Sequence, residues 1–166
     1  MSDASVTVVV EIPKGSRNKY EIDHDSGAIW LDRHLFTATQ YPADYGFVPD
    51  TLAGDGDPLD ALVLLDEPTF PGVHIRARAI GVFWMRDEAG PDAKLLCVPE
   101  SDPRWSHLDD LDDVPEHLKA EITHFFEIYK ALEPSKHTQI DAWQDRTKAI
   151  ETIVDARERF AREHAN

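Results

Sequence analysis

The stretch Gly54-Asp55-Gly56-Asp57-Pro58-Leu59-Asp60-Ala61-Leu62-Val63-Leu64-Leu65 joins an acidic turn to a short apolar run. Glycine and proline separate the carboxylates of the turn, whereas residues 61–65 have the length and composition of a buried strand. Asp60 opens that strand, so we expect it to be half-buried and to need a partner, because a buried carboxylate is costly alone. The stretch therefore predicts a group of acids fixed at the end of a buried strand.

Further strands are expected on both sides of this stretch. Five segments are β-branched or alternate between apolar and polar residues: 6–12, 18–23, 28–32, 73–85 and 94–98. The turn signal Asp25-Ser26-Gly27 joins the second of these to the third. Residues 86–92 are expected to form the turn between the last two, and residues 41–46 a loop rich in turns.

The last third of the chain changes to the period of a helix. Apolar residues recur at steps of three and four over 114–132, and a second stripe runs from about 141 to 163. Asp112 or Asp113 can cap the first helix, and Pro115 suits its first turn. Several short strands followed by two helices predict an α+β fold, mainly β, with a barrel or curled sheet packed by helices.

Length and composition limit the possible classes. The chain has 166 residues, of which 42% are hydrophobic, so we expect one domain over residues 1–166 with a packed core. No apolar run approaches the roughly 20 residues of a membrane span, and the start, Met1 to Ala4, has no secretory leader pattern, which makes a cytoplasmic location the expectation. The single cysteine, Cys97, excludes an intrachain disulfide and a cysteine zinc site.

The net charge of −15 argues against a nucleic-acid binder, because phosphate backbones repel an acidic surface. It leaves a well-solvated surface or an acidic cluster that binds cations. Three carboxylates in the turn 54–60 repel one another unless a cation lies between them, and oxygen ligands favour Mg²⁺, Mn²⁺ or Ca²⁺. A calcium EF-hand loop fails on spacing, since Leu59 and Asp60 stand at its fifth and sixth positions.

Other polar groups are ordinary when each is taken alone. Asp92 and Lys94 lie two apart on an expected strand and so share a face, as do Lys19 and Glu21. Taken singly, these groups read as surface ion pairs, and the nearby tyrosines as the edges of a core.

Taken jointly and in order, these groups point to one family. The sequence reads Glu11-Ile-Pro…Lys19-Tyr-Glu21, Asp32-Arg33, Tyr41-Pro…Asp44-Tyr45-Gly46, Asp55-Gly-Asp57-Pro-Leu-Asp60, Asp87-Glu-Ala-Gly-Pro-Asp92-Ala-Lys94 and His124-Phe-Phe-Glu-Ile-Tyr129-Lys130. Over residues 6–133 this order closely resembles the soluble family I inorganic pyrophosphatases of bacteria. The resemblance implies a five-stranded barrel of the oligonucleotide-binding (OB) type with flanking α-helices, Mg²⁺-dependent hydrolysis of pyrophosphate to two phosphates, and a homohexamer built as a dimer of trimers.

The resemblance also implies a role for each matching position. Metal ligands would be Asp55, Asp60 and Asp92 for the tighter ions, and Glu11 and Asp87 for ions that arrive with the substrate. Asp57 and Asp92 are candidates for orienting or deprotonating the attacking water. Phosphate contacts would come from Lys19, Arg33, Tyr45, Lys94, Tyr129 and Lys130, with Tyr41 and Glu21 in support. The resemblance gives no role to His24 or His34, and the helix expected from 141 carries no motif.

Charge counting agrees with a need for several metal ions. The six carboxylates of this set carry −6 and its four Lys and Arg side chains +4, so the metal-free site is about −2 and repels a polyanion, whereas three Mg²⁺ bring it to about +4. No constellation of Ser, Cys or His stands out, which favours attack by a metal-activated water over a covalent intermediate.

Two other functions fit part of the pattern. A non-catalytic metal-binding OB-type interaction module explains the acidic turn, but not the ordered lysines, arginine and tyrosines. A hydrolase of nucleotides or longer polyphosphates needs a base-stacking pocket or a glycine-rich phosphate loop, and neither is apparent.

Overall fold

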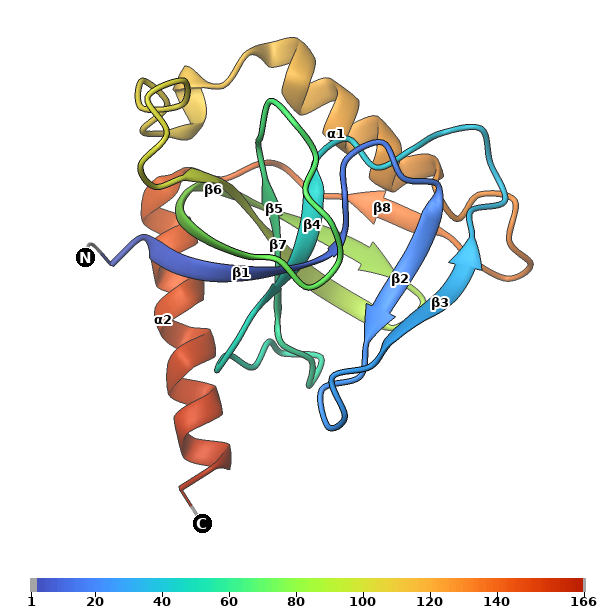
Figure 1. The fold of residues 1–166 in the computed structure, drawn as a ribbon, viewed down its shortest axis with the longest axis horizontal. Coiled ribbons are helices and arrows are strands. Elements are labelled where there is room, and N and C mark those ends of the chain that lie inside the picture. The colour runs from blue at the N-terminus through green and yellow to red at the C-terminus, as the bar shows by residue number, and fades with distance from the viewer. Residues whose placement is uncertain (1–2, 166) are drawn as a thin grey trace.

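The computed structural model of the protein describes residues 3–165 (Figure 1), so Met1, Ser2 and Asn166 lie outside the described residues, including the first two positions inspected for a leader. In chain order the elements are β1 (Ser5–Ile12), β2 (Asn18–Ile22), β3 (Ile29–His34), β4 (Asp44–Val48), β5 (Leu59–Val63), β6 (His74–Asp87), β7 (Gly90–Pro99), a short 3-10 helix (Leu111–Asp113), α1 (Glu116–Ile128), β8 (Thr138–Ile140) and α2 (Arg146–Glu163).

Five strands close into a ring, which confirms the predicted fold class. The large sheet has the order β1-β4-β5-β7-β6-β8. Because β1 also pairs with β6, the first five strands of this order form a closed ring. All of these pairs are antiparallel except β5 with β7. Strands β2 and β3 form a separate ribbon, which lies on the opposite side of the ring from α2 in Figure 1.

The loop predicted over residues 41–46 is wrong in part, because Asp44–Val48 forms strand β4. The role of Gly46 here is close packing, because a Cβ at this position would lie 1.9 Å from the carbonyl oxygen of Val9 on β1. The turn expected over 86–92 was also too long. Strands β6 and β7 pair down to Asp87 and Gly90, so the polar residues of this segment belong to a long hairpin.

The helices begin later than predicted. Pro115 is the N-cap of α1 and makes no side-chain capping bond, so the prediction that Asp112 or Asp113 caps this helix was wrong. Asp113 instead completes a capping box with Asp110 around the short 3-10 helix. Helix α2 begins at Arg146, after Asp145, whose carboxylate accepts a hydrogen bond from the backbone N–H of Lys148 at 3.1 Å.

The two helices cover two separate apolar clusters. One joins α1 to the ring through aromatic side chains, including Phe83, Phe125 and Phe126. The other joins α2 to the ring through smaller side chains, including Ala149 and Ile153. Among residues 3–165 no helix is both long enough and apolar enough to cross a bilayer.

Candidate active site

Lys94 lies at the centre of the predicted site and is fully buried. Its ammonium donates hydrogen bonds to Tyr45 Oη at 2.7 Å, Asp92 Oδ2 at 2.8 Å and Asp60 Oδ2 at 3.0 Å, which uses all three of its protons. Burial lowers the pKa of Lys94, but Asp60, Tyr45 and Asp92 outweigh burial and raise the pKa well above its usual value. Lys94 is therefore a fixed cation between two carboxylates.

Strand pairing brings these groups together. Asp60 and Lys94 are direct neighbours in the parallel pair β5–β7, and Tyr45 comes from the adjacent strand β4. Asp92 and Lys94 share a face, as their spacing predicts. Asp60 is half-buried with a cationic partner, which confirms the expectation from the opening stretch. Burial raises the pKa of Asp92, with Lys94 partly opposing it and Asp60 adding to it.

Glu11 extends this acidic group from the end of β1. Its Oε2 accepts a hydrogen bond from the backbone N–H of Ile22 at 2.9 Å, which ties β1 to β2. Burial raises the pKa of Glu11 to about 7, a rise that the Ile22 hydrogen bond partly opposes and the charge of Asp60 increases. Glu11 therefore shares an electrostatic environment with Asp60, although the two lie far apart in the sequence.

The raised pKa of Glu11 predicts a pH dependence of stability in metal-free protein. The carboxyl group has an ordinary pKa of 4.5 and one of about 7 when folded, so the folded state binds the proton more tightly. Its contribution is most favourable below pH 4.5 and is lost as the pH rises through 7. Glu11→Gln should flatten this decline between about pH 5 and about pH 8, measured by urea unfolding in EDTA.

Glu67→Gln, at an exposed position outside the site, is the control and should keep the wild-type profile. An unaltered decline in the Glu11 variant would contradict the burial of this carboxyl.

Asp55 and Asp57 lie on the exposed turn before β5. The backbone N–H of Asp57 donates to Asp55 Oδ1 at 3.0 Å, and Gly56 between them has φ +90°, a left-handed conformation that glycine adopts without strain. Burial, followed by repulsion from Asp55 and Asp92, raises the pKa of Asp57. The turn therefore brings Asp57, with Asp55 beside it, within electrostatic range of Asp92.

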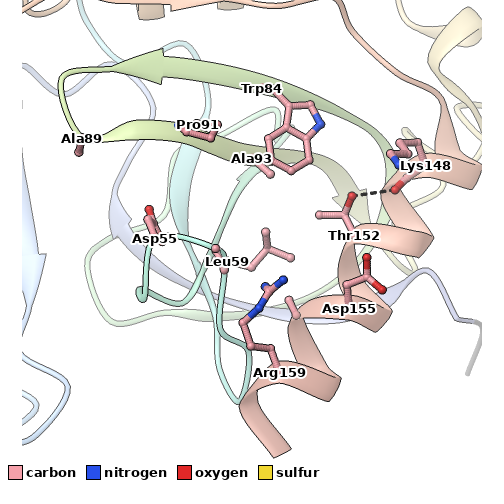
Figure 2. A pocket seen from close by; sticks show the side chains of 13 residues that line it. Asp55, Leu59, Trp84, Ala89, Pro91, Ala93, Lys148, Thr152, Asp155 and Arg159 are labelled. Atoms are coloured by element: carbon pink, nitrogen blue, oxygen red, sulfur yellow. Dashed lines mark hydrogen bonds between the residues drawn. The ribbon is translucent and has the colours of Figure 1, made fainter. Parts of the chain in front are cut away.

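Helix α2 fixes the segment that leads into this turn. The Leu52 N–H donates to the Ala156 carbonyl at 3.0 Å, and Arg159 Nη1 donates to the Leu52 carbonyl at 2.8 Å. A cavity of about 340 Å³ separates the turn, the β6–β7 hairpin and α2, with Asp55 and Arg159 among its lining residues (Figure 2). The helix without a motif thus holds both backbone polar groups of Leu52.

Arg159→Met should loosen the acidic turn, because it removes the hydrogen bond to Leu52 and keeps most of the apolar stem. We expect a stability loss of about 1 kcal/mol, the usual net value of one hydrogen bond. Hydrogen exchange of residues 52–57 should become faster, while exchange in β6 stays unchanged. Arg162→Met, at an exposed position on the same helix, should change neither quantity. Equal exchange in the two variants would contradict the anchoring role.

A second ionic group lies where α1 ends. Lys130 Nζ is 3.1 Å from Asp87 Oδ2 and 3.6 Å from Glu88 Oε1, and Lys136 Nζ is 2.9 Å from the same Glu88 oxygen. Tyr129 packs beside this group, and burial raises its pKa, with Lys94 and Lys130 opposing. Tyr129 therefore connects the Lys130 group to the Lys94 group.

A third ionic group surrounds Arg33 at the end of β3. Asp32 Oδ2 lies 2.6 Å from Arg33 Nη1 and 3.0 Å from Lys19 Nζ, and Glu133 Oε2 lies 3.0 Å from Arg33 Nη2. Burial lowers the pKa of Arg33, but Glu133 and Asp32 outweigh burial and raise it. The Arg33 guanidinium is therefore held on both sides by carboxylates.

Both supporting residues lie next to this set. Tyr41 is buried, with its ring centroid 5.6 Å from that of Tyr45. Burial raises the pKa of Tyr41, Tyr129 raises it further, and Lys94 and Arg33 lower it. The Tyr41 hydroxyl is therefore close enough to both cations to feel their charges. Glu21 contributes a small repulsion to Glu11. The structure thus connects all the predicted site residues by contacts or by charge.

The carboxylates fit the metal dependence that the resemblance implies. Among residues 3–165 no three Asp, Glu, His or Cys side chains form a ready-made metal cage. The donors are nevertheless all carboxylate oxygens, and repulsion from Asp60 or Asp92 reaches Glu11 and Asp57. Lys94 already holds a positive charge between Asp60 and Asp92. Oxygen donors whose charges repel one another suit a hard divalent cation such as magnesium.

Several participating residues were not predicted. Asp32 was visible beside Arg33, but its bonds to two cations were not foreseen. Glu133 had no signal, because its partner lies 100 residues away. Asp44 is buried on β4 and accepts hydrogen bonds from the backbone N–H groups of Lys14 and Thr69, so it fixes two loops beside the site.

The chain is similar to known proteins in sequence and in fold. A family model described as inorganic pyrophosphatase matches residues 8–161. The inorganic pyrophosphatase of Streptomyces coelicolor is 62% identical over 153 residues, which cover 92% of this chain and 94% of that protein. The crystal structure of inorganic pyrophosphatase from Thermus thermophilus superposes with a TM-score of 0.93 at 50% identity and covers 95% of this chain and 91% of that one.

The corresponding enzyme of Helicobacter pylori has a TM-score of 0.93 at 45% identity, with coverage of 96% of this chain and 95% of that one. Sequence family, relatives and fold agree over nearly the whole length, and the acids, lysines and tyrosines of the motif lie together in the structure. The chain therefore belongs to the inorganic pyrophosphatase family.

Proposed function

We propose that this protein hydrolyses inorganic pyrophosphate to two orthophosphates with magnesium ions as cofactor. The observation that carries the proposal is the group of carboxylates around the buried cation Lys94, with further Lys and Arg side chains beside it, in a chain of the pyrophosphatase family. Metal dependence belongs to the family, and magnesium is the specific part of the proposal, because it prefers carboxylate oxygens and phosphate.

Five carboxylates are proposed as the metal ligands. Asp55, Asp60 and Asp92 would hold the tighter ions, and Glu11 and Asp87 those that arrive with the substrate. Magnesium, when bound, lowers the pKa of water and neutralises phosphate charge. The protein supplies the arrangement: Lys94 keeps the Asp60 and Asp92 carboxylates side by side against their repulsion.

The cations and hydroxyl groups of the site are proposed to bind the two phosphates. In the reaction a water oxygen bonds to one phosphorus, and the bridging oxygen leaves with the electron pair of the broken P–O bond. Charge grows on the leaving phosphate, where point charges such as Lys19 and Lys130 and the planar fork of Arg33 stabilise it. Tyr45, Lys94 and Tyr129 complete the proposed phosphate contacts and lie among these charges.

Asp57 and Asp92 are proposed to orient the attacking water or take its proton. In the metal-free protein, burial and neighbouring acids raise the pKa of each, so each holds a proton more tightly there than an ordinary aspartate does. Asp57 lies on the exposed turn, whereas Asp92 is hydrogen-bonded to Lys94 at 2.8 Å.

The test is phosphate release from pyrophosphate by purified protein with magnesium. We expect turnover that EDTA abolishes and excess magnesium restores. Release from ATP under the same conditions should be much slower, and comparable rates would favour a general polyphosphate hydrolase. No release would leave only a metal-binding OB-type interaction module, which family membership already disfavours.

Assembly and location remain part of the proposal. We propose a homohexamer, built as a dimer of trimers, in the cytoplasm, with pyrophosphate and phosphate as ligands and neither nucleic acid nor membrane as partner. Sedimentation should give a species of about six chain masses, and a monomer would overturn the assembly without affecting the chemistry.

A further inference from the structure

Arg33 is already engaged by carboxylates at both ends of its guanidinium group. Nη1 contacts Asp32 at 2.6 Å and Nη2 contacts Glu133 at 3.0 Å. The third nitrogen, Nε, is buried and has no hydrogen-bond partner among residues 3–165. A guanidinium presents five N–H groups to oxygen acceptors, and it binds phosphate best when two of them point at the same ligand. A phosphate that takes an N–H group now held by Asp32 or Glu133 must therefore displace that carboxylate.

The two carboxylates differ in what they lose by displacement. Asp32 is 33% exposed and keeps a second cation, Lys19, at 3.0 Å. Glu133 is 8% exposed, and within the described residues Arg33 is its only ion-pair partner. A carboxylate this far from water is costly without a partner. Displacing Glu133 from Arg33 therefore opposes phosphate binding more than displacing Asp32 does.

The backbone fixes Glu133 in this position. It lies in the turn after α1, where its N–H donates to the Lys130 carbonyl at 2.9 Å and its own carbonyl accepts from the Lys136 N–H at 3.3 Å. Lys130 is itself a proposed phosphate ligand three residues away. Glu133 thus places a negative charge beside Arg33, one of the cations that are proposed to receive a polyanion.

We propose that Glu133 competes with phosphate for the Arg33 guanidinium and so sets the affinity of the site for its substrate and product. The proposal rests on the proposed function, because it takes Arg33 as a phosphate ligand. It assigns Glu133 as a positioning residue that weakens binding of an anion carrying several charges and favours its departure after cleavage. A tightly held product slows an enzyme whose turnover depends on release.

The decisive variant is Glu133→Gln, which keeps the size and an oxygen acceptor for Nη2 but removes the charge. Inorganic phosphate, titrated calorimetrically with magnesium present, should bind about fivefold more tightly, which is at the lower end of the usual range for coupled interactions in proteins. KM for pyrophosphate should fall, and kcat should not rise. A merely structural role for Glu133 predicts weaker phosphate binding and a higher KM instead.

Two further variants distinguish a local effect from a general charge effect. Glu116→Gln removes the same charge from an exposed ion pair with Lys119 on α1 and should leave phosphate affinity unchanged. In an Arg33→Met background, Glu133→Gln should lose most of its gain, because the guanidinium for which Glu133 competes is absent. The same gain in both backgrounds would overturn the proposal.

The proposal and the proposed function fail in different ways. Absence of pyrophosphate hydrolysis in the wild-type protein would refute the function. Unchanged or weaker phosphate binding in a folded, active Glu133→Gln variant would refute only the competition. Thermal unfolding of each variant, followed by circular dichroism, verifies that the compared proteins are folded.

Discussion

Asp60→Asn is expected to lower magnesium-dependent phosphate release by at least about a hundredfold while leaving the fold intact. Asp60 is hydrogen-bonded to Lys94 and repels both Asp92 and Glu11. It is therefore the strongest candidate for a metal ligand shared between two ions. Asparagine keeps the oxygen that accepts the Lys94 hydrogen bond but removes the charge. A hundredfold loss corresponds to about 3 kcal/mol in the transition state, within the several kcal/mol that a metal supplies.

The measurements for this variant are kcat over a range of magnesium concentrations and the circular dichroism melt. Asp66→Asn is the matched control, since Asp66 is an exposed aspartate paired with Arg104 at 3.2 Å, and it should retain wild-type turnover. Near-normal turnover of the Asp60 variant at saturating magnesium would remove this residue from the metal site.

Lys94→Met is expected to destabilise metal-free protein by about 3 kcal/mol at neutral pH. It leaves two partly buried carboxylates side by side without their cation, and breaking a buried ion pair costs about 3–5 kcal/mol. The lower end applies because the Asp60 and Asp92 side chains are 24% and 16% exposed. Urea unfolding in EDTA measures this loss. Lys148→Met, which removes a partly exposed lysine on α2, should cost far less.

The destabilisation should depend on pH with a definite sign. Without Lys94 the pKa of Asp92, already raised, rises further, so the folded state binds the proton more tightly than the unfolded state. Stability of the variant should therefore increase as the pH falls from about 8 to about 5. Magnesium should also stabilise the variant more than the wild type, because the ion takes over neutralisation of the carboxylates. A loss independent of both pH and magnesium would contradict this role of Lys94.

The parts of the site that are local in sequence could be predicted. Glycine and proline between the aspartates of residues 54–60 indicate an acidic turn. Asp92 and Lys94 are two residues apart on a strand, so their side chains are expected on the same face. Strand β4 could not be predicted, because residues 41–46 have the composition of a turn. Glycine is needed at position 46 because β1 packs closely against it. A glycine that serves strand packing is not distinguishable from one that serves a turn by its identity alone.

Pairings between distant segments could not be predicted. The contact of Arg33 with Glu133 spans 100 residues, and nothing in either segment indicates the other. The hydrogen bonds between α2 and Leu52 were equally unpredictable, because every residue has the backbone groups that Leu52 uses. The family resemblance supplied the roles of individual residues, whereas the ionic partners that restrain those residues came from the structure.

The contacts of α2 also have a consequence for biosynthesis. Besides holding Leu52, this helix reaches the first strand, where Arg157 donates to the Ser5 carbonyl at 3.1 Å. A nascent chain emerges from the ribosome starting at its N-terminus, so the acidic turn is synthesised before the helix that secures it. Strands β1 to β7 therefore leave the ribosome before α2 does, and the acidic turn gains the two hydrogen bonds at Leu52 only after that helix has emerged.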